Sequence, residues 1–101
     1  MWYKLDENNN PVKAKNIEDY YKWVSKNQEK RTVMRQDVDG VTISTVFLGS
    51  DHSYPKNDNK PLLWETMIFE GEHDGYQERY YSFDNAVDGH FEALKLVTKN
   101  K

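Results

Sequence analysis

The pattern of apolar and polar positions along the chain predicts strands joined by tight turns and two amphipathic helices. Short runs rich in β-branched and aromatic residues, typical of strands, lie at 2–5, 11–14, 31–38, 41–48, 62–69 and 76–81. Apolar residues recur at helical spacing over 16–27 and again over 83–97. The order ββ-α-ββ-ββ-α predicts one α+β domain over residues 1–101, with an antiparallel sheet of about six strands and the helices on one face.

The strongest hairpin signal is Asp39-Gly40. Asp-Gly readily adopts the type I′ turn, whose twist matches that of the flanking strands. A two-residue turn at this point pairs Val38 with Val41 and Met34 with Thr45.

A long polar loop, residues 49–60, separates strands 41–48 and 62–69. Each of these strands carries apolar residues on both faces, so we expect them at the centre of the sheet. A loop of this length on a rigid scaffold is often a binding element.

The two helices carry recognisable start signals. Asn16 and Ser82 are expected N-caps. Gly89 lies inside the second helix, where glycine costs ~1 kcal/mol relative to alanine. We therefore expect another group to approach the helix backbone closely at Gly89.

Composition narrows the class of protein. Only 37% of the residues are hydrophobic while 14% are aromatic, so aromatic side chains must supply much of the core. The net charge of −3 comes without a basic block, which disfavours nucleic-acid binding. A domain this small buries a modest share of its surface, so its stability margin is small. Formation of a homodimer would add buried surface and is therefore a possibility.

The chain has no cysteine, which excludes disulfides and thiol chemistry. No apolar run approaches the ~20 residues that span a bilayer, so no membrane partner is expected. No signal peptide is visible at the first residues. We expect a cytoplasmic protein. The family resemblance described below would make this the cytoplasm of a bacterial host.

Asp51-His52 at the start of the long loop is the first candidate site. It could supply a general base with its orienting carboxylate, part of a metal site, or polar contacts to a small ligand. The structural alternative is that Asp51 caps a turn while His52 packs against the loop or bonds to it. Two adjacent residues are a weak motif, which favours the structural alternative.

His90 lies on the apolar face of the last helix. It could point into a pocket shared with His52, or be a core histidine bonded to a backbone carbonyl or to Glu65. The second reading is favoured, because buried polar groups are usually hydrogen-bonded within the core.

Glu65 interrupts an apolar strand, and a tight turn at 70–75 would place Arg79 and Tyr80 opposite it. A Glu–Arg pair across a hairpin is usually structural, whereas a buried carboxylate with a raised pKa would be a functional candidate. Tyrosines such as Tyr54 and Tyr80 could support a protein interface or stack on a ligand. The candidate binding residues are therefore Asp51, His52, Tyr54, Glu65, Arg79, Tyr80 and His90.

No metal site or cofactor is expected. A metal site needs three or four converging ligands, and the histidines and acidic residues are scattered along the sequence. The chain also has no phosphate-binding glycine loop and no recognised catalytic motif. The sequence does not decide whether the protein is an enzyme, but the lack of catalytic motifs argues against one.

Three blocks resemble a family of small uncharacterised proteins found in phages, prophages and bacteria. They are Ser44-Thr45-Val46-Phe47-Leu48-Gly49-Ser50-Asp51-His52, Pro61-Leu62-Leu63-Trp64-Glu65-Thr66-Met67-Ile68-Phe69, and Arg79-Tyr80 with Gly89-His90. The family pattern reads S-T-V-F-L-G-x-D-H, P-x-L-F-E-T-M-x-F and R-Y followed by G-H. Trp64 stands where the pattern has Phe, and Glu70 where it has Gly. The resemblance implies an accessory protein of a mobile element, without a known activity.

Three functions follow as hypotheses. The first is a protein that binds and inhibits or modulates a host protein, such as a component of anti-phage defence. The second is a protein that sequesters a small ligand or nucleotide signal, with Asp51, His52, Arg79 and His90 lining one pocket. The third is a small metal-dependent hydrolase, which requires His52 and His90 to converge.

Overall fold

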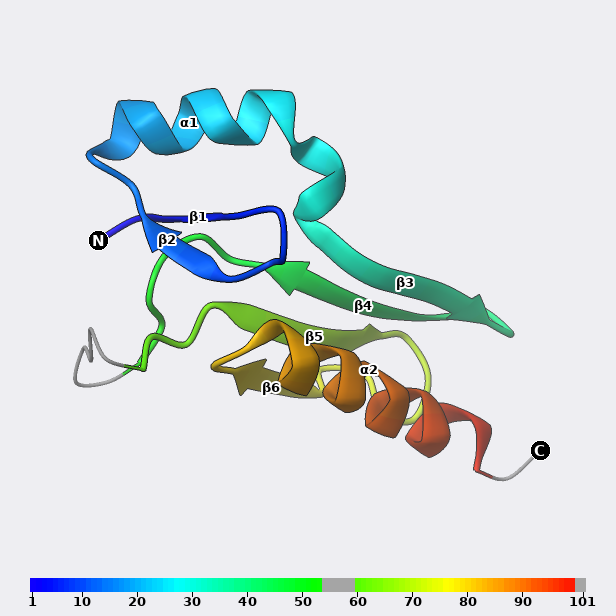
Figure 1. Ribbon diagram of the computed structural model, residues 1–101. Helices are drawn as coiled ribbons and strands as arrows, with labels where there is room; N and C mark the ends of the chain where they lie inside the picture. The colour runs from blue at the N-terminus through cyan, green and yellow to red at the C-terminus, as the bar shows by residue number, and fades with distance from the viewer. Residues whose placement is uncertain (54–59, 100–101) are drawn as a thin grey trace.

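A computed structural model describes residues 1–53 and 60–99 of the chain (Figure 1). Its elements are, in order, β1 (Tyr3–Leu5), β2 (Pro11–Lys13), α1 (Ile17–Lys26), a short 3₁₀ helix η1 (Gln28–Lys30), β3 (Thr32–Val38), β4 (Val41–Phe47), β5 (Trp64–Phe69), β6 (Gln77–Tyr80) and α2 (Phe83–Thr98). The α+β class, the six strands and the two helices are confirmed.

The strands form two antiparallel sheets, where the sequence pattern predicted one. Strands β1 and β2 make a small hairpin, while the larger sheet has the order β3-β4-β5-β6. An isolated bridge between Trp2 and Ser50 is what links the hairpin to the loop after β4. Strands β1 and β2 have three residues each, and they pair with each other rather than with the larger sheet.

The predicted turn at Asp39-Gly40 is present, with the expected register. Both turn residues have positive φ, 49° and 83°, as a type I′ turn requires. Val38 pairs with Val41 and Met34 with Thr45. The central positions of β4 and β5 in the larger sheet are also confirmed.

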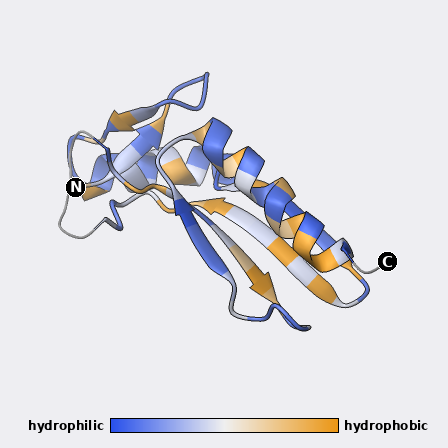
Figure 2. Ribbon diagram, turned by 90° about the horizontal axis from the view of Figure 1, so that it is seen from below, coloured by the Kyte–Doolittle hydropathy of each residue, from blue (hydrophilic) through white to orange (hydrophobic). Residues whose placement is uncertain are grey.

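Helix α2 covers one face of the larger sheet, and its polar and apolar positions alternate along its length (Figure 2). Side chains alternate between faces along a strand, so Ile43, Phe47, Trp64 and Ile68 point toward α2 and are fully buried. The opposite face carries exposed or half-buried residues such as Met67, apart from buried Glu65. The described chain therefore leaves much of that face open to solvent.

Helix α1 packs at the end of the larger sheet rather than across its centre. Asn16 caps it as expected, by accepting the Asp19 backbone N–H through Oδ1 at 2.9 Å. The Trp23 ring meets Phe47 edge-on, with centroids 5.9 Å apart. Tyr20 packs on the backbone of Gly49 at the start of the long loop. These two aromatic contacts fix the position of α1 beside the loop.

The group that approaches Gly89 in α2 is Tyr80 from β6. A Cβ placed on Gly89 would lie 2.1 Å from the Tyr80 hydroxyl oxygen and 2.2 Å from Cζ. Glycine at this position thus lets the tyrosine ring lie against the helix backbone. The expected close approach is confirmed.

Among the described residues, no helix is both long enough and apolar enough to cross a bilayer.

Candidate functional site

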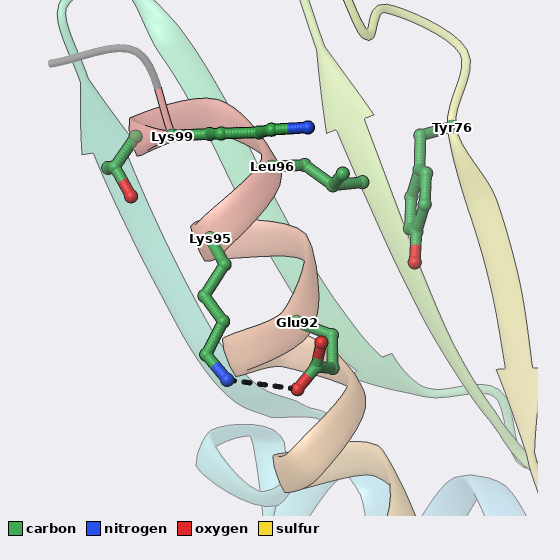
Figure 3. A pocket seen from close by; sticks show the side chains of 6 residues that line it. Tyr76, Glu92, Lys95, Leu96 and Lys99 are labelled. Atoms are coloured by element: carbon green, nitrogen blue, oxygen red, sulfur yellow. Dashed lines mark hydrogen bonds and ion pairs between the residues drawn. The ribbon is translucent and has the colours of Figure 1, made fainter.

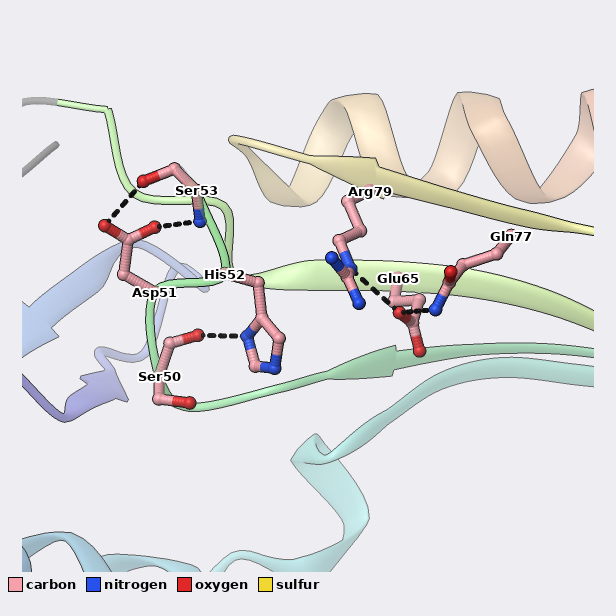
Figure 4. Close-up of polar contacts among 7 residues, drawn as sticks. All are labelled: Ser50, Asp51, His52, Ser53, Glu65, Gln77 and Arg79. Carbon is pink, nitrogen blue, oxygen red and sulfur yellow. Dashed lines mark hydrogen bonds and ion pairs between the residues drawn. The ribbon is translucent and has the colours of Figure 1, made fainter. Parts of the chain in front are cut away.

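Asp51 connects the two ends of the long loop, and Figure 4 shows its contacts with Ser53 at one of them. Its Oδ1 accepts the backbone N–H groups of Ser53 at 2.8 Å and Leu62 at 2.9 Å, and its Oδ2 accepts the Ser53 hydroxyl at 2.8 Å. The His52 N–H also donates to the Leu62 carbonyl at 3.0 Å. Asp51 is buried, with 6% of its surface exposed. Asp51 thus orders the base of the loop, in agreement with the structural alternative.

Replacing Asp51 with alanine is expected to lower the free energy of unfolding by about 1–3 kcal/mol, because buried N–H groups lose their acceptor. Amide hydrogen exchange should accelerate at Ser53 and Leu62. Urea denaturation followed by circular dichroism measures the first effect, and exchange mass spectrometry the second. Asp74→Ala is the matched control, since Asp74 accepts one backbone N–H, that of Glu70, in an exposed turn. Equal losses in both variants would contradict this role of Asp51.

His52 follows Asp51, and one of its two ring nitrogens is hydrogen-bonded. Its Nδ1 is 2.8 Å from the Ser50 carbonyl oxygen, so Nδ1 carries the proton and donates it. No described residue bonds to Nε2, which is an acceptor in the neutral ring. His52 can therefore accept a hydrogen bond from a bound group.

His52 borders a hollow between α1 and the end of the larger sheet, here called the α1 groove. The groove has a volume of about 350 Å³. The side chains that give it its chemistry are Trp2, Tyr20, Tyr21, Arg31, Ser50 and His52. An adjoining hollow of about 410 Å³ shares Val24 and Arg31 with it and continues to Val46. The groove is thus lined by aromatic rings, a cation and two hydrogen-bonding side chains.

Arg31 supplies the positive charge of the α1 groove. Within the described ranges, no carboxylate lies within ion-pair distance of its guanidinium group. The nearby Tyr20 hydroxyl has a pKa raised by burial, an effect that the Arg31 charge partly opposes. An exposed cation between aromatic rings suits a carboxylate or another anionic group on a partner.

Glu65 and Arg79 form the predicted cross-strand pair, but they do not line the α1 groove (Figure 4). Glu65 Oε2 accepts from Arg79 Nε at 2.9 Å and from Gln77 Nε2 at 2.6 Å. The pair lies on the face opposite α2. The Glu65 carboxylate is bonded to two side chains of β6, Arg79 and Gln77. Its arrangement is therefore that of a structural ion pair.

His90 is a fully buried core histidine, although its partners differ from those expected. Its Nε2 is 2.8 Å from Gln36 Oε1 and its Nδ1 is 2.7 Å from Thr45 Oγ1, which in turn is 2.5 Å from Thr66 Oγ1. The amide oxygen is an acceptor, so Nε2 donates, and Nδ1 of the neutral ring accepts from Thr45. Burial lowers the pKa of His90, which keeps the ring neutral. Neither nitrogen bonds to a backbone carbonyl or to Glu65.

The two histidines do not meet in one site. His90 is enclosed between α2 and the sheet, whereas His52 borders the α1 groove near Ser50. No group of three or more His, Asp or Glu residues able to hold a metal ion occurs in the described ranges. The geometry that the hydrolase hypothesis requires is therefore missing from the described structure.

The remaining candidates are Tyr80 and Tyr54. Tyr80 packs under α2 at Gly89, and burial raises its pKa. Its place in the core makes it a structural residue. Tyr54 lies outside the described residues.

Most of the α1 groove was not predicted from the sequence. Trp2, Tyr20, Tyr21 and Arg31 were not singled out as binding residues. The aromatic residues were visible in the sequence, but three separate segments build the groove. Nothing local indicated that residues near 2, 20–31 and 48–52 would meet.

A third hollow, of about 490 Å³, lies between the end of α2 and Tyr76 (Figure 3). Lys95 and Glu92 on its helix side form an ion pair at 3.2 Å. Its lining reaches Lys99, the last described residue. It contains none of the candidate residues, so we regard the α1 groove as the better candidate.

No protein-family model, curated protein or solved structure was found to match this chain.

Proposed function

We propose that this chain is a phage- or prophage-type accessory protein that binds a host protein and inhibits or modulates it by covering part of its surface. The α1 groove is the observation that carries this proposal. Tryptophan, tyrosine and arginine are the residue types that most often dominate the energy of protein interfaces. All three types line this groove, and Tyr21 is 58% exposed.

The surroundings of the groove add apolar area to the proposed interface. Val46 lines the adjoining hollow. Met67 and Phe69 extend the same open face of the sheet away from the groove, to the end where Phe69 pairs with Thr42. Methionine and aromatic residues are enriched in interfaces. We therefore propose a partner that presents an apolar side chain to the groove and a carboxylate to Arg31.

The surroundings of the candidate catalytic groups also favour binding over catalysis. Asp51 holds the loop, Glu65 is bonded to Arg79, and His90 is enclosed by Gln36 and Thr45. The resemblance of three sequence blocks to phage and prophage proteins supplies the host context of the proposal.

Affinity capture from a bacterial lysate with matched variants tests the proposal. Tyr21→Ala and Arg31→Glu alter the groove. Tyr81→Ala removes a tyrosine of similar exposure, 48%, elsewhere on the surface. We expect one host protein to be retained by the wild type and by Tyr81→Ala and lost from both groove variants. Calorimetry with the purified partner should show the same order of affinity. Equal capture by all the proteins, or no capture by the wild type, would count against the proposal.

A second candidate function is the binding of a small anionic aromatic molecule. It is favoured by the size of the α1 groove, which falls in the range of about 300–1,000 Å³ of small-molecule sites. The His52 Nε2, to which no described residue bonds, and the Arg31 guanidinium could both bind such a ligand. Of the four residues first expected to line its pocket, His52 is the one that lines the groove. Native mass spectrometry of the purified protein tests this function, with release of the ligand expected for Arg31→Ala.

A further inference from the structure

Strand β3 has one unpaired edge. It pairs with β4 on one side, and no strand in the described ranges pairs with its other side. Its seven residues make it the longer of the two edge strands of the larger sheet. An edge of this length is a template for pairing with another strand.

The hairpin register shows which backbone groups point outward from β3. Val38 and Val41 flank a two-residue turn, so they bond to each other across the hairpin. Hydrogen-bonding direction alternates along an antiparallel strand. The N–H and C=O groups of Arg35 and Asp37 therefore point away from β4 and toward solvent.

We propose that two copies of this chain pair through β3, antiparallel, with Gln36 facing Gln36 of the second copy at the two-fold axis. In this register Arg35 of each copy lies opposite Asp37 of the other. The outward N–H and C=O groups of these two residues then bond across the interface. The larger sheets of the two copies then become one continuous sheet, with helix α2 of each copy on the same face.

Charge selects this register over its neighbours. Only residues whose backbone N–H and C=O groups point outward can bond across the edge. The two-fold axis must therefore lie at a residue and not between two residues, and the alternative registers move it along β3 one residue at a time. An axis at Arg35 places Arg35 opposite Arg35 of the second copy, and an axis at Asp37 places Asp37 opposite Asp37 of the second copy. Like charges directly opposite destabilise a strand pair, whereas opposite charges stabilise it. The axis at Gln36 alone gives opposite charges at both positions.

The other face of β3 supports the same register. Met34 and Val38 are half-buried on the α2 side, and the axis at Gln36 sets them opposite each other. Phe91 is 44% exposed and follows His90, whose ring reaches Gln36 on β3. Phe91 thus lies near the flank of α2 beside this edge, where a second copy would cover it. Such burial suits a small domain with few aliphatic residues.

Sedimentation equilibrium with charge-reversed variants tests this register. Arg35→Glu sets a glutamate against Asp37, and Asp37→Arg sets an arginine against Arg35, so each variant alone should have a dissociation constant raised at least about tenfold. An equimolar mixture of the two variants should dimerise again. In the mixed pair the introduced glutamate of one copy faces the introduced arginine of the other, and the native Asp37 faces the native Arg35. The double variant Arg35→Asp/Asp37→Arg should also recover.

Glu78→Arg, on the opposite edge strand β6, is the matched control and should dimerise like the wild type. Circular dichroism checks that each variant is folded. A folded wild type that stays monomeric at about 100 μM, well above the micromolar affinity of a weak specific complex, would overturn the proposal. So would a dimer that both single variants leave intact, which would place the interface elsewhere. The proposed host-binding residues Tyr21 and Arg31 are not changed in these variants, so the two proposals fail independently.

Discussion

Replacing His90 with leucine is expected to lower the free energy of unfolding by about 2–4 kcal/mol. Leucine fills much of the same volume, so the loss comes mainly from hydrogen bonds rather than from a cavity. The Gln36 amide oxygen would stay buried without its partner, and the Thr45 hydroxyl would keep Thr66 as a partner but lose His90. Urea denaturation followed by circular dichroism measures the effect.

A double-mutant cycle separates this network from simple packing. The bond between Thr45 and His90 is already lost in His90→Leu, so adding Thr45→Val does not remove it a second time. The double variant should therefore be more stable than the sum of the single losses implies, by about 0.5–3 kcal/mol. His73→Ala, in the turn between β5 and β6, is the control and should stay within about 0.5 kcal/mol of the wild type. Additive losses would mean that the hydrogen bonds of His90 contribute little.

The same histidine should make stability depend on pH. Burial lowers the pKa of His90 in the folded protein from its ordinary value of 6.5. Below pH 6.5 the unfolded chain binds a proton on His90 that the folded chain does not yet bind, so stability falls as the pH falls. In His90→Leu this part of the fall should disappear. The comparison isolates His90, because His52 and His73 are present in both proteins.

The parts of the fold that sequence predicted correctly are those fixed by local chemistry. Asp39-Gly40 specified its hairpin and register without help from distant residues. Asn16 and Ser82 cap the helices through short side-chain bonds within one turn. The Glu65–Arg79 pair followed from a tight turn between neighbouring strands. Gly89 indicated a close approach, although the sequence did not identify Tyr80 as the residue involved.

The parts that sequence could not predict depend on contacts between distant segments. The attachment of the β1–β2 hairpin to the loop after β4 depends on how Trp2 meets Ser50. The partners of His90 come from β3 and β4, far away in the chain. The α1 groove likewise needs α1 to be placed against the loop after β4. Periodicity identifies which residues of a helix are apolar but not which strand they will touch.

The junction that places α1 can itself be tested. Gly49→Ala is expected to lower the free energy of unfolding by about 2–4 kcal/mol, because it combines backbone strain with steric overlap. Gly49 has φ of 83°, and an added Cβ would lie 2.3 Å from the Tyr20 hydroxyl oxygen and 2.6 Å from two ring carbons. Its carbonyl also accepts the Tyr3 N–H at 2.8 Å. Displacing Tyr20 would therefore loosen both α1 and β1 from the sheet.

Gly40→Ala provides the matched control for strain. Gly40 has the same φ of 83°, but nothing lies within 4 Å of an added Cβ. Its loss should be about 1 kcal/mol, the lower end of the strain in this conformation. The excess loss in Gly49→Ala then measures the overlap with Tyr20. Denaturant titrations of the two variants give both values, and equal losses would mean that Tyr20 moves aside at no cost. A large excess would show that the α1 groove is held in shape by a ring packed on one glycine, so that binding at the groove should weaken in the same variant.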